Sequence, residues 1–138
     1  MKNLYFLLFC LPLKHLMLTS SYGYRVHPVT GKYAFHSGID LRAHRDTVFA
    51  ITNGFAAVAY DQLLGLNVKI SDSTFCFIYG HLSQVFGSGP VLAGTPIGIT
   101  GATGRVTGEH LHLSIKYQGL YLDPAEFLYE LIKTNDHE

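Results

Sequence analysis

The chain has 138 residues, enough for one domain with a single hydrophobic core and too few for two comfortable ones. Ten Lys and Arg balance ten Asp and Glu, so no basic patch or acidic tail indicates binding to nucleic acid. Nine Phe, nine Tyr and fourteen Gly favour strands and turns over helices. Eight histidines are many for this length, and histidine is the commonest metal ligand in proteins.

The N-terminal residues 1–17 are predicted to form a hydrophobic leader, with a basic start at Lys2 and an almost wholly apolar run over residues 4–13. These are two of the three marks of a secretory signal, so we expect an export signal or an uncleaved membrane anchor. The third mark, a cleavage site with small residues, is missing, and the run is short for a transmembrane helix. The alternative is that this segment is a hydrophobic first strand of the fold itself.

Short apolar and β-branched runs, separated by Gly, Pro, Asn and Asp, predict a series of strands in the rest of the chain. The expected strands lie within residues 16–24, 47–50, 54–60, 67–71, 75–79 and 91–100. Asn53 and Gly54 form a strong two-residue hairpin signal, so the strands on either side of them are expected to pair.

One helix is expected, near the C-terminal end. Asp123 is a good N-cap, and Pro124 suits the first helical position. Apolar residues follow at helical spacing: Phe127, Leu128, Leu131 and Ile132. We therefore predict an all-β domain over residues 18–132, a compact antiparallel sheet or sandwich with one short C-terminal helix, followed by a polar tail over residues 133–138.

His110 and His112 are separated by one residue in a run that is typical of a strand. Because the side chains of a strand alternate between its two faces, both imidazoles must point to one side and Leu111 and Leu113 to the other. The apolar side suits a core, and the imidazole side suits a metal site. The alternative is a pair of surface histidines on a half-exposed strand.

His36 and Asp40 form a second candidate pair. In an extended chain these positions share a face, and Gly38 between them keeps the space open. With one imidazole of the His-x-His strand they give three nitrogen and oxygen ligands, a set that suits Zn²⁺ with a fourth position left for water. His81, directly after Gly80, adds an imidazole for the proton transfer that a hydrolase needs.

Four short motifs follow one another along the chain: 22–28 (YGYRVHP), 36–40 (HSGID), 79–82 (YGHL) and 108–112 (GEHLH). A glycine-rich stretch at residues 98–104 lies between the last two motifs. In this order they resemble the lysostaphin-type (LytM-like) zinc metalloendopeptidases, which cut peptide bonds in bacterial peptidoglycan. The resemblance covers nearly the whole chain beyond the leader. It implies a compact antiparallel β domain, of the duplicated-hybrid-motif type, with one zinc ion per chain.

The resemblance also implies roles for single residues. His36, Asp40 and His112 match the zinc ligands. His81 and His110 match the two histidines that flank the metal-bound water and the developing oxyanion. One of these two would be the general base and the other would stabilise the tetrahedral intermediate, and the sequence does not decide which.

Arg25 and His27 match the family motif as well, and we interpret them as residues of the substrate groove or of the structure. Two features depart from the family pattern. Ser114 stands where many relatives have Glu, which predicts a looser contact behind the metal ligands. The loop at residues 42–47 is unusually charged, which bears on substrate preference.

The resemblance implies a zinc metalloendopeptidase of the bacterial cell envelope whose partners are peptidoglycan peptides. We expect a monomer, without a nucleic-acid partner, that is held at the membrane if the leader is an anchor. A rival hypothesis is a non-catalytic regulator of the same fold that binds and activates an amidase. Relatives of that kind have lost metal ligands, whereas all five site positions are present here. A second rival is a zinc hydrolase that acts on a protein outside the wall.

Overall fold

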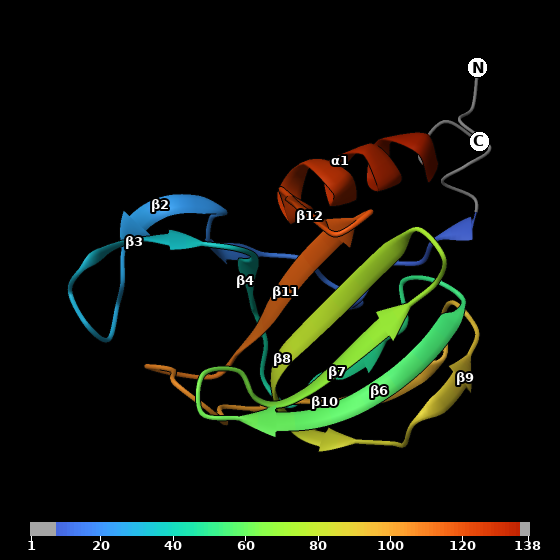
Figure 1. Cartoon of the computed structure of the whole chain (residues 1–138), viewed down its shortest axis with the longest axis horizontal. Helices are drawn as coiled ribbons and strands as arrows, with labels where there is room; N and C mark the ends of the chain where they lie inside the picture. Colours follow the sequence, from blue (N-terminus) through green and yellow to red (C-terminus); the bar gives the residue numbers. More distant parts are fainter. Residues whose placement is uncertain (1–7, 136–138) are drawn as a thin grey trace.

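Strands dominate the structure, as the short β-branched and aromatic runs predict. The computed structural model describes residues 8–135, and within them the chain forms twelve strands and one helix (Figure 1). The predicted fold class, antiparallel β-sheet with one short C-terminal helix, is confirmed. The elements are β1 (Leu18–Ser20), β2 (Gly23–Val26), β3 (Tyr33–His36), β4 (Ile39–Arg42), β5 (Thr47–Phe49), β6 (Gly54–Asp61), β7 (Gly65–Ser71), β8 (Phe75–Val85), β9 (Gly89–Val91), β10 (Pro96–Thr100), β11 (His110–Tyr117), β12 (Leu120–Leu122) and α1 (Pro124–Asn135).

Ten of the strands form one antiparallel sheet. Its main path runs in the order β1-β4-β11-β8-β7-β6-β9, while β10 pairs with β5 and β8, and β12 pairs with β11. The other two strands, β2 and β3, form a separate hairpin, seen at the left of Figure 1. Only residues 37–38 connect β3 to β4, so the hairpin stays close to the β4 side of the sheet.

β11 lies in the middle of the sheet, between β4 and β8. Leu111, Leu113 and Ile115 are fully buried on its core face, which confirms the alternation predicted for this strand. Burying each of these side chains stabilises the fold by about 1.5–3 kcal/mol. Because a slip of one residue would turn both histidines into the core and these side chains out of it, the core fixes the register of the strand.

The second half of the predicted leader packs into the domain. Phe9 and Leu13 lie in the hydrophobic core, and the Phe9 ring packs edge-on against Phe127 of α1 with centroids 5.1 Å apart. The Cys10 backbone N–H donates to the Ile51 carbonyl at 2.8 Å. Residues 8–17 form no strand, since β1 begins at Leu18, so the alternative of a hydrophobic first strand is wrong, although Phe9 and Leu13 are buried in the fold.

Residues 1–7 of the predicted leader and 136–138 of the predicted tail lie outside the described part of the chain. Within the described residues, no helix has the length and apolar character needed to cross a membrane.

The C-terminal helix starts where the sequence predicts. The Asp123 carboxylate accepts the Ala125 backbone N–H at 2.9 Å, as expected of an N-cap. The buried residues of its inner face include Phe127, Leu128 and Leu131. Ile132 is exposed, and the helix continues through Asn135, so the predicted stripe is one residue too wide and the predicted tail begins too early.

The hairpin predicted at Asn53 and Gly54 does not form. β5 pairs with β10, whereas β6 pairs with β7 and β9. The Asn53 side chain instead accepts the Ala93 backbone N–H at 2.7 Å, and thereby ties this turn to the segment between β9 and β10. Long-range pairing therefore overrides the local turn signal.

Truncation of Leu13 tests whether the N-terminal segment is part of the core. Because its side chain is only 2% exposed, Leu13→Ala should lower the free energy of unfolding by about 2–5 kcal/mol. The matched control is Leu8→Ala in the same segment, since Leu8 is 60% exposed and its loss should change stability little. Urea unfolding of the full chain measures both, and equal effects of the two substitutions would contradict the packing described.

Candidate metal centre

Asp40 and His112 are brought together by strand pairing. They are direct partners in the antiparallel ladder of β4 and β11, so their side chains lie on the same face of the sheet. His110, two residues before His112, is the diagonal neighbour of Asp40 on that face. Its Nε2 lies 3.4 Å from Asp40 Oδ1, as does His112 Nδ1.

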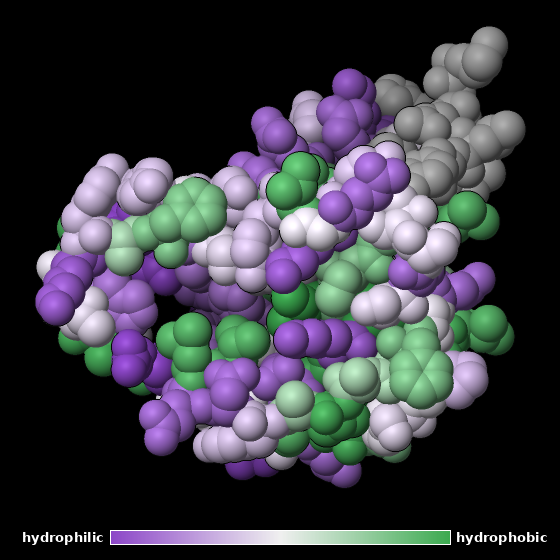
Figure 2. Space-filling view, in the orientation of Figure 1, coloured by the Kyte–Doolittle hydropathy of each residue, from purple (hydrophilic) through white to green (hydrophobic). Residues whose placement is uncertain are grey.

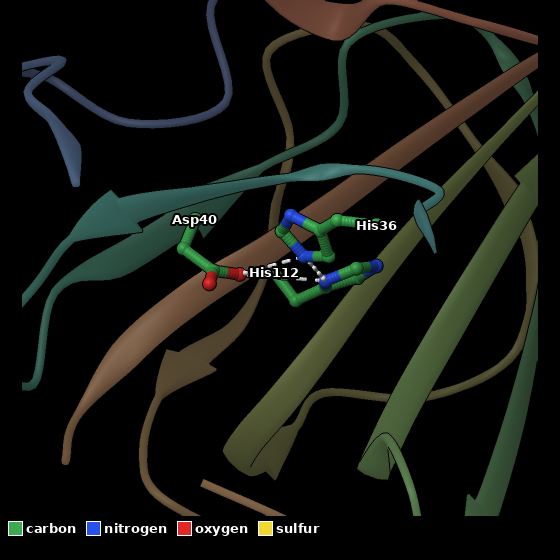
Figure 3. Close-up of side chains that lie close together, drawn as sticks. All are labelled: His36, Asp40 and His112. Atoms are coloured by element: carbon green, nitrogen blue, oxygen red, sulfur yellow. Dashed lines mark hydrogen bonds and ion pairs between the residues drawn. The ribbon is translucent and has the colours of Figure 1, made fainter. Parts of the chain in front are cut away.

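His36 reaches the same point from the end of β3. Its Nε2 lies 3.4 Å from Asp40 Oδ1 and 3.3 Å from His112 Nδ1 (Figure 3). Gly38, between the pair, packs directly against β11: a Cβ there would lie 2.4 Å from the Leu113 carbonyl oxygen and 2.7 Å from Ser114 Oγ. The absence of a side chain at Gly38 therefore lets the turn from β3 to β4 approach β11.

The three ligand atoms have the spacing of a zinc site. Tetrahedral zinc holds nitrogen and oxygen ligands at about 2.0–2.2 Å, which places neighbouring ligand atoms about 3.3–3.6 Å apart. The distances among His36 Nε2, Asp40 Oδ1 and His112 Nδ1 are 3.3, 3.4 and 3.4 Å. Two imidazoles and one carboxylate also form a donor set that zinc prefers. The residues therefore fit a zinc ion.

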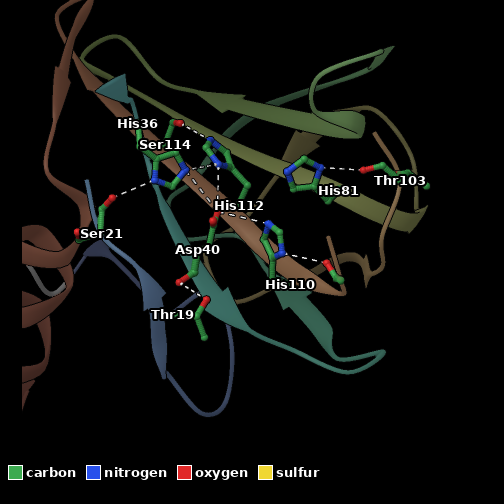
Figure 4. Close-up of polar contacts among 10 residues, drawn as sticks. Thr19, Ser21, His36, Asp40, His81, Thr103, His110, His112 and Ser114 are labelled. Carbon is green, nitrogen blue, oxygen red and sulfur yellow. Dashed lines mark hydrogen bonds and ion pairs between the residues drawn. The ribbon is translucent and has the colours of Figure 1, made fainter. Parts of the chain in front are cut away.

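Hydrogen bonds behind the triangle fix which ring nitrogens face it (Figure 4). His36 Nδ1–H donates to the Ser21 carbonyl at 3.0 Å, and His112 Nε2 is hydrogen-bonded to Ser114 Oγ at 2.8 Å. In the neutral His36 ring Nε2 is then a bare lone pair, and His112 Nδ1 is one in the tautomer whose Nε2–H donates to Ser114. In that tautomer three acceptor atoms converge, an arrangement that a cation would stabilise.

Burial and charge act in opposite directions at this site. Burial alone would raise the pKa of Asp40, but its contacts with His112 and His36 outweigh burial and hold that pKa well below its usual range. Burial lowers the pKa of His112, although its contact with Asp40 opposes the shift. Asp40 is therefore a buried anion.

His81 is aimed at the site by a β-bulge. Along β8 two residues, Gly80 and His81, oppose one residue of β7, and His81 has a positive φ of 61°. Its backbone N–H donates to the Leu64 carbonyl at 2.6 Å, and its Nδ1–H donates to the Thr103 carbonyl at 2.7 Å. Nε2 therefore remains as a free acceptor. Burial lowers the pKa of His81 to about 4, so the ring is neutral near pH 7.

His110 lies beside His81, with ring centroids 4.9 Å apart. Its Nδ1–H donates to the Gly108 carbonyl at 3.0 Å, which turns Nε2 toward Asp40. The structure thus brings together all five residues that the sequence singled out, His36, Asp40, His81, His110 and His112 (Figure 4).

These side chains line a pocket of about 220 Å³ that also includes Arg25 and His27 of the β2–β3 hairpin. Figure 2 shows the hollow beside the hairpin, rimmed by hydrophilic residues. His27 Nδ1 accepts the backbone N–H groups of Val29 and Thr30 at 3.1 and 3.2 Å, so this ring stabilises the hairpin loop.

Some supporting groups carried no sequence signal. The carbonyls of Ser21 and Thr103 orient two of the histidines, and backbone groups leave no side-chain pattern. Ser114 was noted only as a departure that loosens a contact, yet its hydroxyl is buried and bonded to His112. Arg105, which also lines the pocket, was not singled out.

Gly38→Ala tests the close approach of the two ligand-bearing segments. The added Cβ meets backbone atoms of β11, so we expect the free energy of unfolding to fall by about 1–3 kcal/mol, with weaker metal binding. Gly108→Ala is the matched control, because a Cβ there meets open space. Urea unfolding and metal titration measure both, and a Gly38→Ala variant as stable as the control would contradict this packing.

Comparison with known proteins agrees with this geometry. The sequence profile of Peptidase family M23 matches residues 34–124, more than half of the chain. The peptidoglycan DD-endopeptidase ShyC of Vibrio cholerae is 38% identical over 105 residues, which are 72% of this chain and 24% of that protein. The chain spans about a quarter of the length of the curated relatives that it matches.

Solved structures share the fold. A zinc-containing peptidase from Vibrio cholerae superposes with a TM-score of 0.72 at 31% identity, over 82% of this chain and 37% of that chain. The catalytic domain of lysostaphin from Staphylococcus simulans does so with a TM-score of 0.73 at 25% identity, over 83% and 92% of the two chains. From the profile match and these neighbours, the chain belongs to peptidase family M23, the lysostaphin-type peptidases.

Proposed function

We propose that the chain is a zinc-dependent endopeptidase that hydrolyses peptide bonds in bacterial peptidoglycan. The single observation that carries this proposal is the buried triangle of His36 Nε2, Asp40 Oδ1 and His112 Nδ1, three acceptors at zinc-ligand spacing on the wall of an open pocket. Zinc held there would polarise a scissile carbonyl and make a water acidic enough to act as nucleophile near neutral pH.

His81 is the proposed general base. Its Nδ1–H is bound to the Thr103 carbonyl, so Nε2 is the atom left to accept a proton, and a ring that is neutral near pH 7 is ready to do so. His110 is the proposed hydrogen-bond donor to the developing oxyanion, because its Nε2 lies 3.4 Å from Asp40 Oδ1. Since Nδ1–H is bound to the Gly108 carbonyl, the ring would donate through Nε2 as an imidazolium.

Peptidoglycan is the proposed substrate because of the family and because ShyC is named a peptidoglycan DD-endopeptidase. The proposed place of action is therefore the cell envelope.

Digestion of intact peptidoglycan by the purified full chain tests the proposed function. Mass spectrometry should show new amino termini in the soluble products, and a chelator should abolish their release. One equivalent of bound zinc without any cleavage would point instead to the amidase-activating regulator or to a substrate outside the wall.

Loss of a metal ligand should remove the zinc. His112→Ala and Asp40→Asn each delete one corner of the triangle, so zinc affinity should fall by more than the roughly 100-fold that loss of an outer-shell partner can cause. Activity on peptidoglycan should disappear with the metal. The control is Glu130→Gln on the exposed side of α1. Titration against a chromophoric chelator gives the affinities, and wild-type affinity in either variant would exclude that residue as a ligand.

Loss of His81 should leave zinc in place but stop turnover. His81→Asn is the variant of choice, because Asn tolerates the positive φ of this position better than Ala does. We expect zinc content to stay at wild-type level while kcat falls about 10²- to 10⁴-fold. His44→Asn, at an exposed loop histidine, serves as control. Full activity of His81→Asn would remove this residue from the mechanism.

A further inference from the structure

Arg25 is a cation in the pocket wall that has no ion-pair partner among residues 8–135. Its Nε atom is buried and makes no hydrogen bond. Among the described residues no carboxylate lies within ion-pair distance of its guanidinium. A buried, unpaired donor of a charged group is costly, and a ligand that accepts from this group would offset that cost.

A second guanidinium faces the same pocket. Arg105, in the loop between β10 and β11, also lines it and makes no ion pair within the described chain. Partial burial, and then the charges of Arg25 and Arg105, lower the pKa of His27. Both guanidinium groups therefore act on the part of the pocket wall that holds His27. Of the acidic residues that the structure describes, Asp40 alone lines the pocket. Because Asp40 belongs to the ligand triangle, the part of the pocket wall formed by Arg25, His27 and Arg105 carries uncompensated positive charge.

The position of Arg25 relative to the triangle follows from strand register. In the β2–β3 hairpin Gly23 stands opposite His36, and Arg25 stands opposite Ala34, two residues from His36 on the same face. Diagonal neighbours of this kind lie about 7–8 Å apart. Arg25 and His36 are thus about two extended residues apart along the hairpin, and the Arg25 side chain lines the same pocket as the ligand set.

We infer that Arg25, with Arg105, forms a subsite for a free carboxylate of the substrate, namely the α-carboxylate of the residue that supplies the amine of the scissile bond. This inference rests on the proposed function and specifies its substrate class. Guanidinium binds carboxylate through two parallel hydrogen bonds, which suits a planar anion held next to the cleaved bond.

Chain geometry selects that carboxylate over others. From the scissile carbonyl carbon to the α-carboxyl carbon of the following residue there are three bonds, whose lengths add up to about 4.3 Å. The residue on the acyl side has used its own α-carboxyl group in the scissile bond. The nearest α-carboxylate that can be free therefore belongs to the amine side, within the reach that the register gives to Arg25.

This subsite divides peptide bonds into two classes. A residue that ends its chain keeps a free carboxylate next to the cleaved bond, and so does a diamino diacid that is cross-linked through an amine whose own carbon bears a free carboxylate. A residue inside a bridge of backbone amides has none. The chain should therefore prefer the first class, and should discriminate against glycine-type bridges by leaving Arg25 unpaired.

Binding of two non-hydrolysable probes tests the subsite without relying on turnover. The probes are ketomethylene isosteres of acetyl-D-alanyl-D-alanine, one with a free carboxylate and one with a carboxamide. They are titrated calorimetrically into the zinc-loaded full chain at about 0.15 M salt, which screens long-range attraction. The wild-type chain should bind the free acid roughly 10- to 100-fold more tightly than the carboxamide.

Three variants locate the source of this preference. Arg25→Met should weaken binding of the acid roughly 10- to 100-fold and leave the carboxamide unchanged. Arg25→Lys should restore part of the preference, since it keeps the charge but not the paired donors. Lys32→Met removes one charge from the same hairpin outside the pocket and should keep the wild-type preference.

Equal affinity of the wild-type chain for acid and carboxamide, binding of neither probe, or an equal loss in Lys32→Met and Arg25→Met would overturn the subsite. These outcomes are separate from the fate of the proposed function. Chelator-sensitive cleavage of peptidoglycan without a preference for the acid probe would support the endopeptidase activity and contradict the subsite. A preference for the acid probe without cleavage of peptidoglycan would support the subsite and contradict the endopeptidase activity.

Discussion

A buried carboxylate at the meeting point of three imidazoles is the constraint on which the site depends. Asp40 is only 7% exposed, and its Oδ1 lies 3.4 Å from a ring nitrogen of His36, His110 and His112. An ionised carboxylate buried in this way needs a compensating positive charge. Two of the facing nitrogens are bare lone pairs in the neutral tautomers whose opposite N–H groups donate to Ser21 and Ser114. A bound divalent cation satisfies all three atoms at once, so the same feature explains the geometry and the proposed chemistry.

The core of the domain holds this constraint in place. The face of β11 that carries His110 and His112 is opposite the face that carries Leu111 and Leu113, so the hydrophobic effect sets the register that also places the ligands. Ser114 is placed by the same register, because it lies on the histidine face of β11, and its hydroxyl is hydrogen-bonded to His112 Nε2. A neutral hydroxyl there makes His112 a less basic ligand than an imidazole backed by a carboxylate would be.

Sequence patterns predicted the features that depend on local periodicity. The two faces of the His-x-His strand and the N-cap at Asp123 follow from side-chain alternation and capping. Gly38 was expected to keep open space between His36 and Asp40, whereas it packs directly against β11. The predictions that failed concern features that depend on contacts between distant segments. Asn53 and Gly54 favour a hairpin locally, but β5 gains more by pairing with β10. Phe9 and Leu13 belong to an apolar run that resembles a leader in sequence, but in the folded chain they are part of the hydrophobic core. The bulge that turns His81 into the pocket is set by mismatched registers on β7 and β8, which no single segment encodes.

The most direct test of the central claim is a crystal structure of the zinc-loaded chain with anomalous data at the zinc edge. We predict a single peak about 2.0–2.2 Å from His36 Nε2, an Asp40 carboxylate oxygen and His112 Nδ1. The rings of His81 and His110 should stand free of the metal on the pocket side. A peak at another place, or one bound by His110 instead of His36, would contradict the assignment of ligands and catalytic histidines on which the account is built.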